Sequence, residues 1–187
     1  KIVTCDSCDY SANMDVAVCK EQIPNTTNEQ EIKEIYTPDV KTIDDLENFL
    51  QVSKANFIKS VVYYRIDTDE TVIVFIRGDK EVNETKLRNY LKVDDEHLVP
   101  KTEEDDGICY GFIGPKDLDA KVTVVMDKSL ENETCLVAGA NKKDYHIENI
   151  CVDRDLSNIT FDDVSKVQEG DTCPICKKGK LKIVHGI

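Results

Sequence analysis

The 187-residue sequence predicts a single domain of the α/β class with mixed α+β content, in which a central mixed, largely antiparallel sheet is flanked by helices. Apolar stretches at Val61–Ile66 and Thr71–Arg77, separated by the polar turn 67–70, have the pattern of a β-hairpin. Helical segments with one apolar face begin at Thr42 and Asn83, two good helix-capping residues. A Cys-x-x-Cys pair near each end of the chain predicts a zinc-ribbon-like knuckle that joins the termini.

The N-terminal third is predicted to hold two helices and one strand. A short helix over Met14–Lys20 is followed by a polar loop at Pro24–Gln30 and by a strand at Ile32–Tyr36. Thr42 and Asp45 resemble a capping box with Asp in place of Glu, and the apolar residues behind them share one helix face. We therefore expect this second helix to pack against the sheet.

The middle of the chain is predicted to surround the hairpin with helices. Ser53 can cap a helical stretch over Lys54–Ser60 just before the hairpin, and Asn83 can cap a helix that ends at Leu91. The strongly acidic segment Lys92–Asp106 is expected to include another short helix. Three further strands, at Val122–Met126, Cys135–Ala138 and Tyr145–Cys151, are expected to complete the sheet, and Phe161–Val167 adds one more element.

Composition and charge exclude several classes of function. The net charge of −13 argues against a broad surface that grips duplex phosphates, but it allows a pocket that holds only the end of a nucleic acid. No apolar run is long enough to cross a bilayer and residues 1–5 lack a signal-peptide pattern, so we expect no membrane partner. The chain starts without methionine and stops at Ile187 without a closing element, which suggests a piece excised from a longer protein.

Eight cysteines without an export signal favour reduced thiols or metal ligands over disulfides. Four of them form the two Cys-x-x-Cys pairs, which are Cys5 with Cys8 and Cys173 with Cys176. Two such pairs suit a tetrahedral structural zinc, which residues 1–10 and 171–182 would share, and four cysteines would leave no open position for catalysis. More than 150 residues separate the pairs, so a shared metal would pin the two ends together. The alternative is four reduced thiols or a disulfide.

A glycine-rich loop lies between the apolar stretches and consists of Gly111, Phe112, Ile113, Gly114 and Pro115. Glycine lets the backbone approach a ligand closely, and proline fixes its own φ. Such a loop can direct several N–H groups at one point, as an oxyanion site or a carbonyl clamp requires. The alternative is a tight turn between strands. Cys109, just before the loop, is a rival nucleophile that would need a nearby base.

Several short segments, taken in order, are similar to one family. They are Asp9–Asn13, Thr37-Pro38 leading to Thr42-Ile43, Ile58–Ser60, Arg77–Glu84, Gly111–Pro115, Gly139–Asn141, His146 and Asp153–Asp155. In this order they resemble the insertion (editing) domain of bacterial prolyl-tRNA synthetase, over nearly the whole chain. The four cysteines occur in only part of that family, so the zinc prediction rests on their spacing.

The resemblance implies an aminoacyl-tRNA deacylase that covers residues 1–187. It would hydrolyse alanine wrongly esterified to the 3′ end of proline tRNA, as part of a cytoplasmic ligase that uses ATP and Mg²⁺ elsewhere in its chain. The physical need is that alanine is smaller than proline, so a proline pocket cannot exclude it. A missing methylene is worth only about 1–3 kcal/mol of discrimination.

The resemblance also implies roles for single residues. The amides of the glycine loop would orient the ester carbonyl and a hydrolytic water, Lys59 would engage the terminal adenosine, and His146 would shape the alanine pocket. Asp127 would hold water or ribose at a strand end, or merely cap a turn. Two further substrate-binding candidates, Arg77 and Asn141, come from the matching segments.

A second hypothesis of a different class is a non-catalytic, zinc-stabilised module that binds tRNA or a protein. The acidic segments 94–96 and 103–106 would suit a protein partner, although acidic runs are usually solvated surface. From the hydrolase hypothesis we expect Lys59, the loop amides, Asp127 and His146 to converge on one small pocket. Loss of the ester from alanyl-tRNA(Pro) discriminates between the two.

Overall fold

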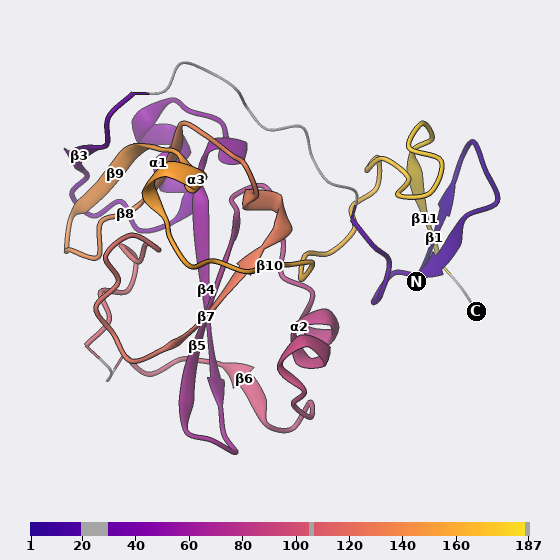
Figure 1. Ribbon diagram of the computed structural model, residues 1–187, viewed down its shortest axis with the longest axis horizontal. Helices are drawn as coiled ribbons and strands as arrows, with labels where there is room; N and C mark the ends of the chain where they lie inside the picture. Colours follow the sequence, from indigo (N-terminus) through magenta and orange to yellow (C-terminus); the bar gives the residue numbers. More distant parts are fainter. Residues whose placement is uncertain (20–29, 105–106, 186–187) are drawn as a thin grey trace.

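The computed structural model describes residues 1–19, 30–104 and 107–185, and it comprises a larger body and a small lobe that carries both chain ends (Figure 1). Most of the loop predicted at 24–30 lies outside these ranges, as do Lys20 and the last two residues of the acidic segment 103–106. Within the described ranges, no helix combines the length and the apolar character that crossing a bilayer requires.

The body is built on a five-stranded mixed sheet. Its strands follow the order β10-β7-β5-β4-β6 and span Ile58–Arg65 (β4), Glu70–Arg77 (β5), Leu98–Pro100 (β6), Thr123–Asp127 (β7) and Phe161–Asp162 (β10). β4 pairs antiparallel with β5 and β6, whereas β7 pairs parallel with β5 and β10. The predicted hairpin is therefore the centre of the sheet.

The remaining strands of the body form a separate antiparallel sheet, so the prediction of one central sheet is wrong. This second sheet has the order β3-β9-β8, with Lys33–Tyr36 (β3), Leu136–Gly139 (β8) and Tyr145–Ile150 (β9). Leu136 and Ile150 face Ile73 and Phe75 of the large sheet in one buried cluster. Face-to-face packing buries the apolar sides of both sheets, which edge-to-edge continuation would leave exposed.

Helices cover the ends and the second face of the large sheet. They are Ile43–Leu50 (α1), Glu84–Leu91 (α2) and Val152–Asp155 (α3), with 3₁₀ turns at Lys54–Asn56 and Lys128–Leu130. The predicted capping box is present, because Thr42 Oγ1 accepts from the Asp45 N–H and Asp45 accepts from the Thr42 N–H. Asn83 caps α2 as predicted.

Side chains alternate along the central strands and so divide the interior in two. In β5, Ile73 and Phe75 belong to the cluster beneath the β3-β9-β8 sheet, whereas Val72, Val74 and Ile76 belong to the cluster beneath α2. Strand β5 is thus buried on both faces, which explains its continuous apolar sequence.

The helix predicted over Lys54–Ser60 is wrong. Ser53 does cap a turn, but only one 3₁₀ turn forms before β4 begins at Ile58. Phe57 and Ile58 are both almost fully buried, and Ile58 pairs with Arg77 at the end of β5. Pairing along the full length of β5 therefore outweighs local helix propensity, and it places Lys59 on a strand.

Two other predicted helices are also absent from the described residues. In place of the helix at Met14–Lys20, residues 14–19 form a turn and irregular chain, with the Met14 N–H bound to the Lys1 carbonyl and Ala17 buried. In the acidic segment, the short strand β6 pairs with the edge of β4 instead of a helix forming. Tertiary contacts decided the structure of both segments.

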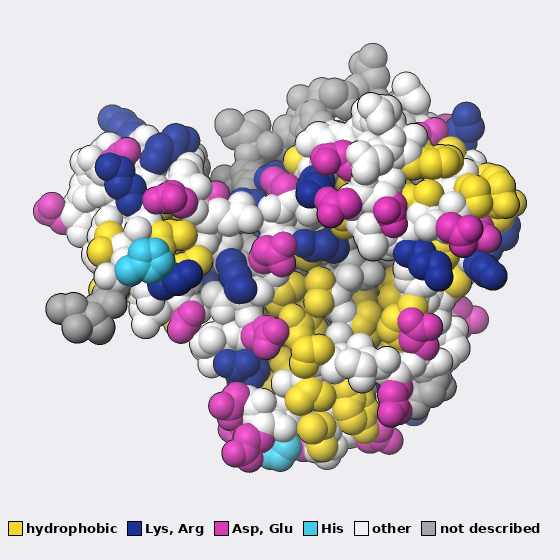
Figure 2. Space-filling model, turned by 180° about the vertical axis from the view of Figure 1, so that it is seen from behind, with side chains coloured by type: hydrophobic (Ala, Val, Ile, Leu, Met, Phe, Trp, Pro, Cys, Tyr) yellow, Lys and Arg dark blue, Asp and Glu magenta, His cyan; other side chains and the backbone are white. Residues whose placement is uncertain are grey.

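The small lobe joins the beginning and the end of the chain. Its three strands, Ile2–Cys5 (β1), Ser11–Asn13 (β2) and Leu181–Val184 (β11), lie in the order β11-β1-β2 and are antiparallel. Its buried core is small, with Val3, Ala17, Val167, Cys173 and Leu181. Figure 2 shows the lobe beside the body, with both basic and acidic side chains on its surface.

Candidate active site

The glycine loop lies directly against the end of β8. A Cβ atom on Gly114 would lie 1.9 Å from the Gly139 carbonyl oxygen, and a Cβ atom on Gly139 would lie 2.2 Å from the Phe112 carbonyl carbon. Gly111 has a φ of +86°, a conformation that favours glycine. Backbone therefore meets backbone here with no side chain between, so a side chain at Gly114 or Gly139 would force the loop and β8 apart.

Asn141 holds this loop in place. The Gly114 N–H donates to Asn141 Oδ1 at 2.9 Å, while Asn141 Nδ2 donates to the carbonyl oxygens of Gly114 at 2.8 Å and Lys116 at 2.9 Å. The Asn141 N–H also donates to the Phe112 carbonyl at 2.8 Å. The amide group of Asn141 is thus used within the protein, so it positions the loop.

A cavity of about 280 Å³ opens beside the loop. It is lined by the start of α1, the first half of β4, Gly111 and Ile113 of the loop, Gly139 at the end of β8, and His146 of β9. The sequence placed the loop, Lys59 and His146 in one site, and residues from all three line this cavity.

The N–H groups of the loop differ in whether they have a hydrogen-bond partner in the protein. The Phe112 N–H donates to the Cys109 carbonyl and the Gly114 N–H donates to Asn141. The N–H groups of Gly111 and Ile113 make no hydrogen bond to any residue in the described ranges, and both residues line the cavity. Paired backbone donors of this kind can stabilise the oxygen of a carbonyl or a tetrahedral intermediate.

His146 forms a buried, uncharged wall of the cavity. Its side chain is 2 % exposed, and burial lowers its pKa from 6.5 to about 4, so the imidazole is neutral at pH 7. Nδ1 lies 2.5 Å from Thr37 Oγ1, and the ring meets Phe112 edge-on with centroids 5.4 Å apart. Neighbours on both sides fix the ring orientation, and the low pKa makes His146 a weak base.

Lys59 lies at the cavity, but its ammonium group does not face the glycine loop. Because Lys59 alternates with Ile58 along β4, its side chain leaves the strand on the α2 side. There Nζ donates to the Lys80 carbonyl and lies 3.6 Å from Glu81 Oε1. The expectation that the Lys59 ammonium group converges on the loop is therefore wrong. The reason is that Lys54–Ser60 was predicted as a helix, whereas residues from Ile58 onward form a strand.

Lys41 is a cavity residue that the sequence reasoning missed. It lines the cavity, and its Cγ would lie 2.8 Å from a Cβ on Gly111, so its aliphatic stem lies over the Gly111 backbone. Its side chain is exposed, which leaves the ammonium group in solvent. The sequence signal that could have identified Lys41 is its position just before Thr42, the residue that caps α1.

Asp127 and Arg77 lie outside the cavity. Asp127 is 1 % exposed, and its carboxylate accepts from the N–H groups of Ser129 and Val164, both at 2.9 Å. It thereby joins the end of β7 to the chain after β10. This matches the second role predicted for Asp127, that of capping a turn, and not the role of holding water or ribose. Arg77 donates to Asp79 at 2.6 and 2.8 Å, and its Nη1 lies 3.7 Å from Glu133. The structure does not bring either residue to the loop.

Cys109 has no feature of an activated nucleophile. Burial raises the pKa of its thiol, with the Asp144 carboxylate adding to the rise, so the thiolate is disfavoured. It does not line the cavity.

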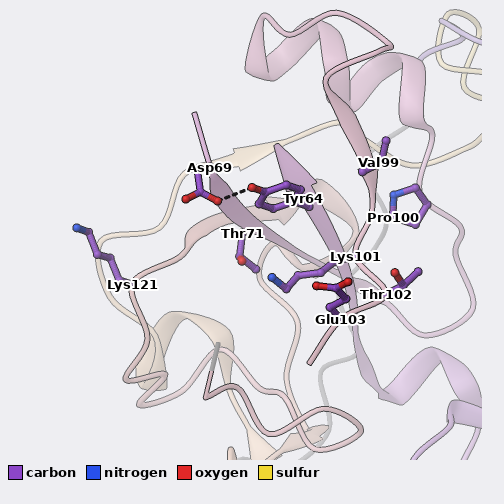
Figure 3. Close-up of a pocket in the computed structure, with 9 residues that line it drawn as sticks. All are labelled: Tyr64, Asp69, Thr71, Val99, Pro100, Lys101, Thr102, Glu103 and Lys121. Atoms are coloured by element: carbon purple, nitrogen blue, oxygen red, sulfur yellow. Dashed lines mark hydrogen bonds between the residues drawn. The ribbon is translucent and has the colours of Figure 1, made fainter. Parts of the chain in front are cut away.

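A larger hollow of about 570 Å³ lies along the same sheet, beside β6 (Figure 3). The Tyr64 hydroxyl donates to Asp69 there, and Lys101 Nζ lies 5.3 Å from the centre of the Tyr64 ring. Its walls are mixed in charge, with Lys101 and Lys121 opposed by Asp69 and Glu103. The glycine loop takes no part in it, so volume alone does not identify the site.

The four predicted metal-ligand cysteines meet in the small lobe. Their Sγ atoms all lie within 4.8 Å of one another, close enough to hold a metal ion, and all four are free thiols. This cluster lies apart from the cavity, among the residues of β1 and the segment before β11.

Comparison with known proteins identifies the family. Residues 37–156, which include the cavity, match the model of the aminoacyl-tRNA editing domain. The chain is 41 % identical over 180 residues to a proline–tRNA ligase of Persephonella marina and 39 % identical over 193 residues to one of Brachyspira hyodysenteriae. These alignments cover 95 % and 98 % of this chain, but only 31 % and 33 % of the two ligases, so the chain spans about a third of these relatives.

The fold also has a solved counterpart. A structure described as a candidate trans-editing enzyme for prolyl tRNA synthetase superposes with a TM-score of 0.59 at 13 % sequence identity, covering 73 % of this chain and 87 % of that one. The predicted resemblance is confirmed by these matches. The chain belongs to the family of aminoacyl-tRNA editing domains.

Proposed function

We propose that this chain hydrolyses the ester of alanine wrongly attached to proline tRNA. The proposal is carried by the groups that line one cavity of about 280 Å³. They are the unused N–H groups of Gly111 and Ile113, the neutral buried imidazole of His146, and Lys41. The similarity to proline–tRNA ligases over nearly the whole chain supports the choice of tRNA.

The loop amides supply the main chemical effect. As water attacks the ester carbonyl carbon, negative charge develops on the carbonyl oxygen, and the N–H groups of Gly111 and Ile113 donate to it. Donors of this kind are worth on the order of 3 kcal/mol each in the transition state. The intermediate then breaks its bond to the ribose oxygen, which takes up a proton, and free alanine and tRNA leave.

We assign the transfer of the proton from the attacking water to a group of the substrate and not to a side chain of the protein. His146 has a pKa of about 4 and is held by Thr37, so it serves to shape the pocket and not as the general base. The ester is already activated, and the free hydroxyl of the terminal ribose adjoins the carbonyl, where it can assist the attacking water. This division explains why no Ser-His-Asp or Cys-His group is needed at the cavity.

Selection for alanine is assigned to the walls of the cavity. Gly111, Gly139 and Ile113 bring the backbone close to the substrate carbonyl, and His146 with Phe112 closes one side. A methyl side chain is smaller than the proline ring, so a narrow part of the cavity beside these walls would admit the first and exclude the second. Steric exclusion by a second, smaller pocket is the established way to edit beyond the limit of binding discrimination.

We assign binding of the tRNA end to Lys41 and, after a rearrangement of its side chain, to Lys59. Lys41 lies over the loop with its ammonium group in solvent, so it can meet a phosphate of the terminal nucleotides without rearrangement. Lys59 can do so only after its ammonium group leaves Lys80 and Glu81. Contact limited to the tRNA end is compatible with a net charge of −13.

The chain is further proposed to act as the insertion domain of a cytoplasmic proline–tRNA ligase. The ATP, Mg²⁺ and proline sites of such an enzyme would lie in other parts of its chain, and those parts would be the main protein partner of this domain. The fraction of each relative that the chain covers, about a third, supports this arrangement.

Ester loss from purified alanyl-tRNA(Pro) tests the proposal. We expect hydrolysis well above the spontaneous rate, and strong loss of activity in Gly111→Val, whose side chain would meet Lys41 and require a φ unsuited to it. Gly107→Asn is the matched control, because Gly107 also has positive φ but has no neighbour within 4 Å of its Cβ position. An ester that persists at the spontaneous rate while the tRNA binds would favour the non-catalytic module.

A further inference from the structure

We propose that Cys5, Cys8, Cys173 and Cys176 bind one zinc ion in a closed tetrahedral site that holds the small lobe together. The proposal is independent of the hydrolytic activity, because the cluster contributes no residue to the cavity. Its support comes from sulfur geometry, from the donors around the sulfurs and from the size of the lobe.

The sulfur positions fit a zinc tetrahedron. A zinc–sulfur bond of about 2.3 Å implies sulfur–sulfur edges of about 3.8 Å when four thiolates surround one ion. The Sγ atoms of Cys5 and Cys176 are 3.7 Å apart, and those of Cys8 and Cys173 are 3.8 Å apart. Both pairs are far beyond the length of a disulfide bond, about 2.05 Å. Because all four Sγ atoms also lie within 4.8 Å of one another, this arrangement is compatible with one ion at a common centre.

Backbone donors point at the sulfurs, as thiolate ligands require. The Ser7 N–H donates to Cys5 Sγ and the Gly179 N–H donates to Cys176 Sγ, both at 3.3 Å. Ser7 follows Cys5 by two residues and Gly179 follows Cys176 by three, so each donor lies in the same turn as its cysteine. Hydrogen bonds to ligand sulfurs stabilise their negative charge and fix their orientation.

The two turns also bind each other without the metal. The Asp6 N–H donates to the Lys180 carbonyl at 3.0 Å, and the Lys180 N–H donates to Asp6 Oδ1 at 2.8 Å. A Cβ on Gly179 would lie 2.3 Å from Cys5 Sγ, so glycine is required where the second turn crosses the first. The sequence therefore provides both the ligands and the space for them.

Charge near the cluster favours a tetrathiolate site. Zinc with four thiolates carries two negative charges, and residues 177–182 include four lysines, Lys177, Lys178, Lys180 and Lys182. Figure 2 shows basic side chains on this lobe beside several acidic ones, in a protein that is acidic as a whole. A local positive field stabilises such a complex.

The lobe is too small to be held by its apolar core. Its three strands contain four, three and four residues, and the five buried residues of its core include Cys173, one of the proposed ligands. Sheets and cores of this size generally need a metal or disulfide. All four cysteines are thiols, which leaves the metal as the cross-link. Because four protein ligands leave no open position, the role is structural.

Metal analysis of the purified 187-residue chain tests this site. We expect about one zinc per chain, falling to near zero in Cys173→Ser, whereas Cys109→Ser, at a cysteine outside the cluster, keeps its zinc. Cobalt added to metal-free protein should give the intense visible absorption of a tetrahedral thiolate complex. Iron in place of zinc, a disulfide between the pairs, or four free thiols after growth with ample zinc would each overturn the proposal.

Hydrogen exchange then tests the role of the ion and remains informative if the cysteine variants fail to fold. Chelation of the metal from the wild-type chain should accelerate exchange at the amides that pair β1 with β11, while amides that pair β4 with β5 stay protected. Unchanged protection in β1 and β11 after complete removal of zinc would contradict a structural role.

Discussion

Asn141 and Gly114 form a reciprocal pair of hydrogen bonds, with the Gly114 N–H donating to Asn141 Oδ1 at 2.9 Å and Asn141 Nδ2 donating to the Gly114 carbonyl at 2.8 Å. The pair fixes the glycine loop against β8, because the Asn141 N–H also binds the Phe112 carbonyl. The two unused loop N–H groups, of Gly111 and Ile113, therefore belong to a segment that Asn141 holds through both its side chain and its backbone N–H.

Asn141→Ala should lower kcat for deacylation on the order of 100-fold, because misplacement of catalytic groups by about 1 Å costs this much. KM should change little, since Asn141 does not face the cavity. Steady-state kinetics measure both quantities. Asn149→Ala is the control, because Asn149 also has positive φ and donates to a backbone carbonyl, but does so at the surface. Equal losses in the two variants would exclude a specific role for Asn141.

Lys41→Ala should raise KM for the tRNA and reduce its dependence on salt. Each lost phosphate contact lowers the slope of log affinity against log salt by roughly 0.7 for a single strand. Lys59→Ala should also raise KM for the tRNA and reduce its dependence on salt. Glu81→Gln should leave KM unchanged or lower it, because it releases Lys59 from an exposed ion pair. Lys128→Ala, at an exposed lysine away from the cavity, is the control.

Salt titrations of tRNA binding decide this prediction. If Lys41→Ala and Lys128→Ala have the same slope, Lys41 does not contact the phosphates.

His146 should make the protein less stable as the pH falls from about 6.5 to about 4. Its pKa is lowered in the folded state from 6.5 to about 4, so between these values the unfolded chain binds the extra proton and the folded chain does not. The contribution of the neutral, buried His146 to the free energy of unfolding is fully present above pH 6.5. It amounts to about 3 kcal/mol, because each unit by which the pKa is lowered is worth about 1.4 kcal/mol. Chemical denaturation at several pH values measures it.

His146→Asn is the comparison that isolates this term from the titration of carboxyl groups. The difference in unfolding free energy between wild type and variant should shrink as the pH falls through this window. A difference that is constant with pH would mean that the imidazole is protonated equally in the folded and unfolded states.

Asp127→Asn should destabilise the protein without removing its activity. Both carboxylate oxygens accept N–H groups, from Ser129 and Val164, and an amide can accept only one of them. A buried N–H left without a partner costs about 1–3 kcal/mol. Thermal unfolding measures the loss, and deacylation well below the new Tm measures the function. A strong fall in kcat of fully folded Asp127→Asn would place Asp127 in the chemistry after all.

The sequence predicted those features that short-range rules control. The hairpin of β4 and β5, the capping box at Thr42 and the cap at Asn83 each depend on residues within a few positions of one another, and all are present. The cysteine spacing likewise predicted that the two chain ends meet. In these cases the local pattern and the tertiary structure agree.

The errors arose where distant partners decide the structure. Lys54–Ser60 has an adequate helix signal, but burial of Phe57 and Ile58 and the pairing with β5 draw it into a strand. That change rotates Lys59 away from the loop and leaves Lys41 as the exposed cation there. Asp127 was predicted near the site because it ends a strand, yet contacts with Ser129 and Val164 determine where its carboxylate points.

The central claim is that the cavity accepts the alanyl ester and excludes the prolyl ester. The most direct measurement compares initial rates of ester loss from alanyl-tRNA(Pro) and prolyl-tRNA(Pro), each corrected for its spontaneous rate. The proposed function predicts rapid loss of alanine, with proline released no faster than without protein. Equal hydrolysis of both esters, or of neither, would contradict the claim.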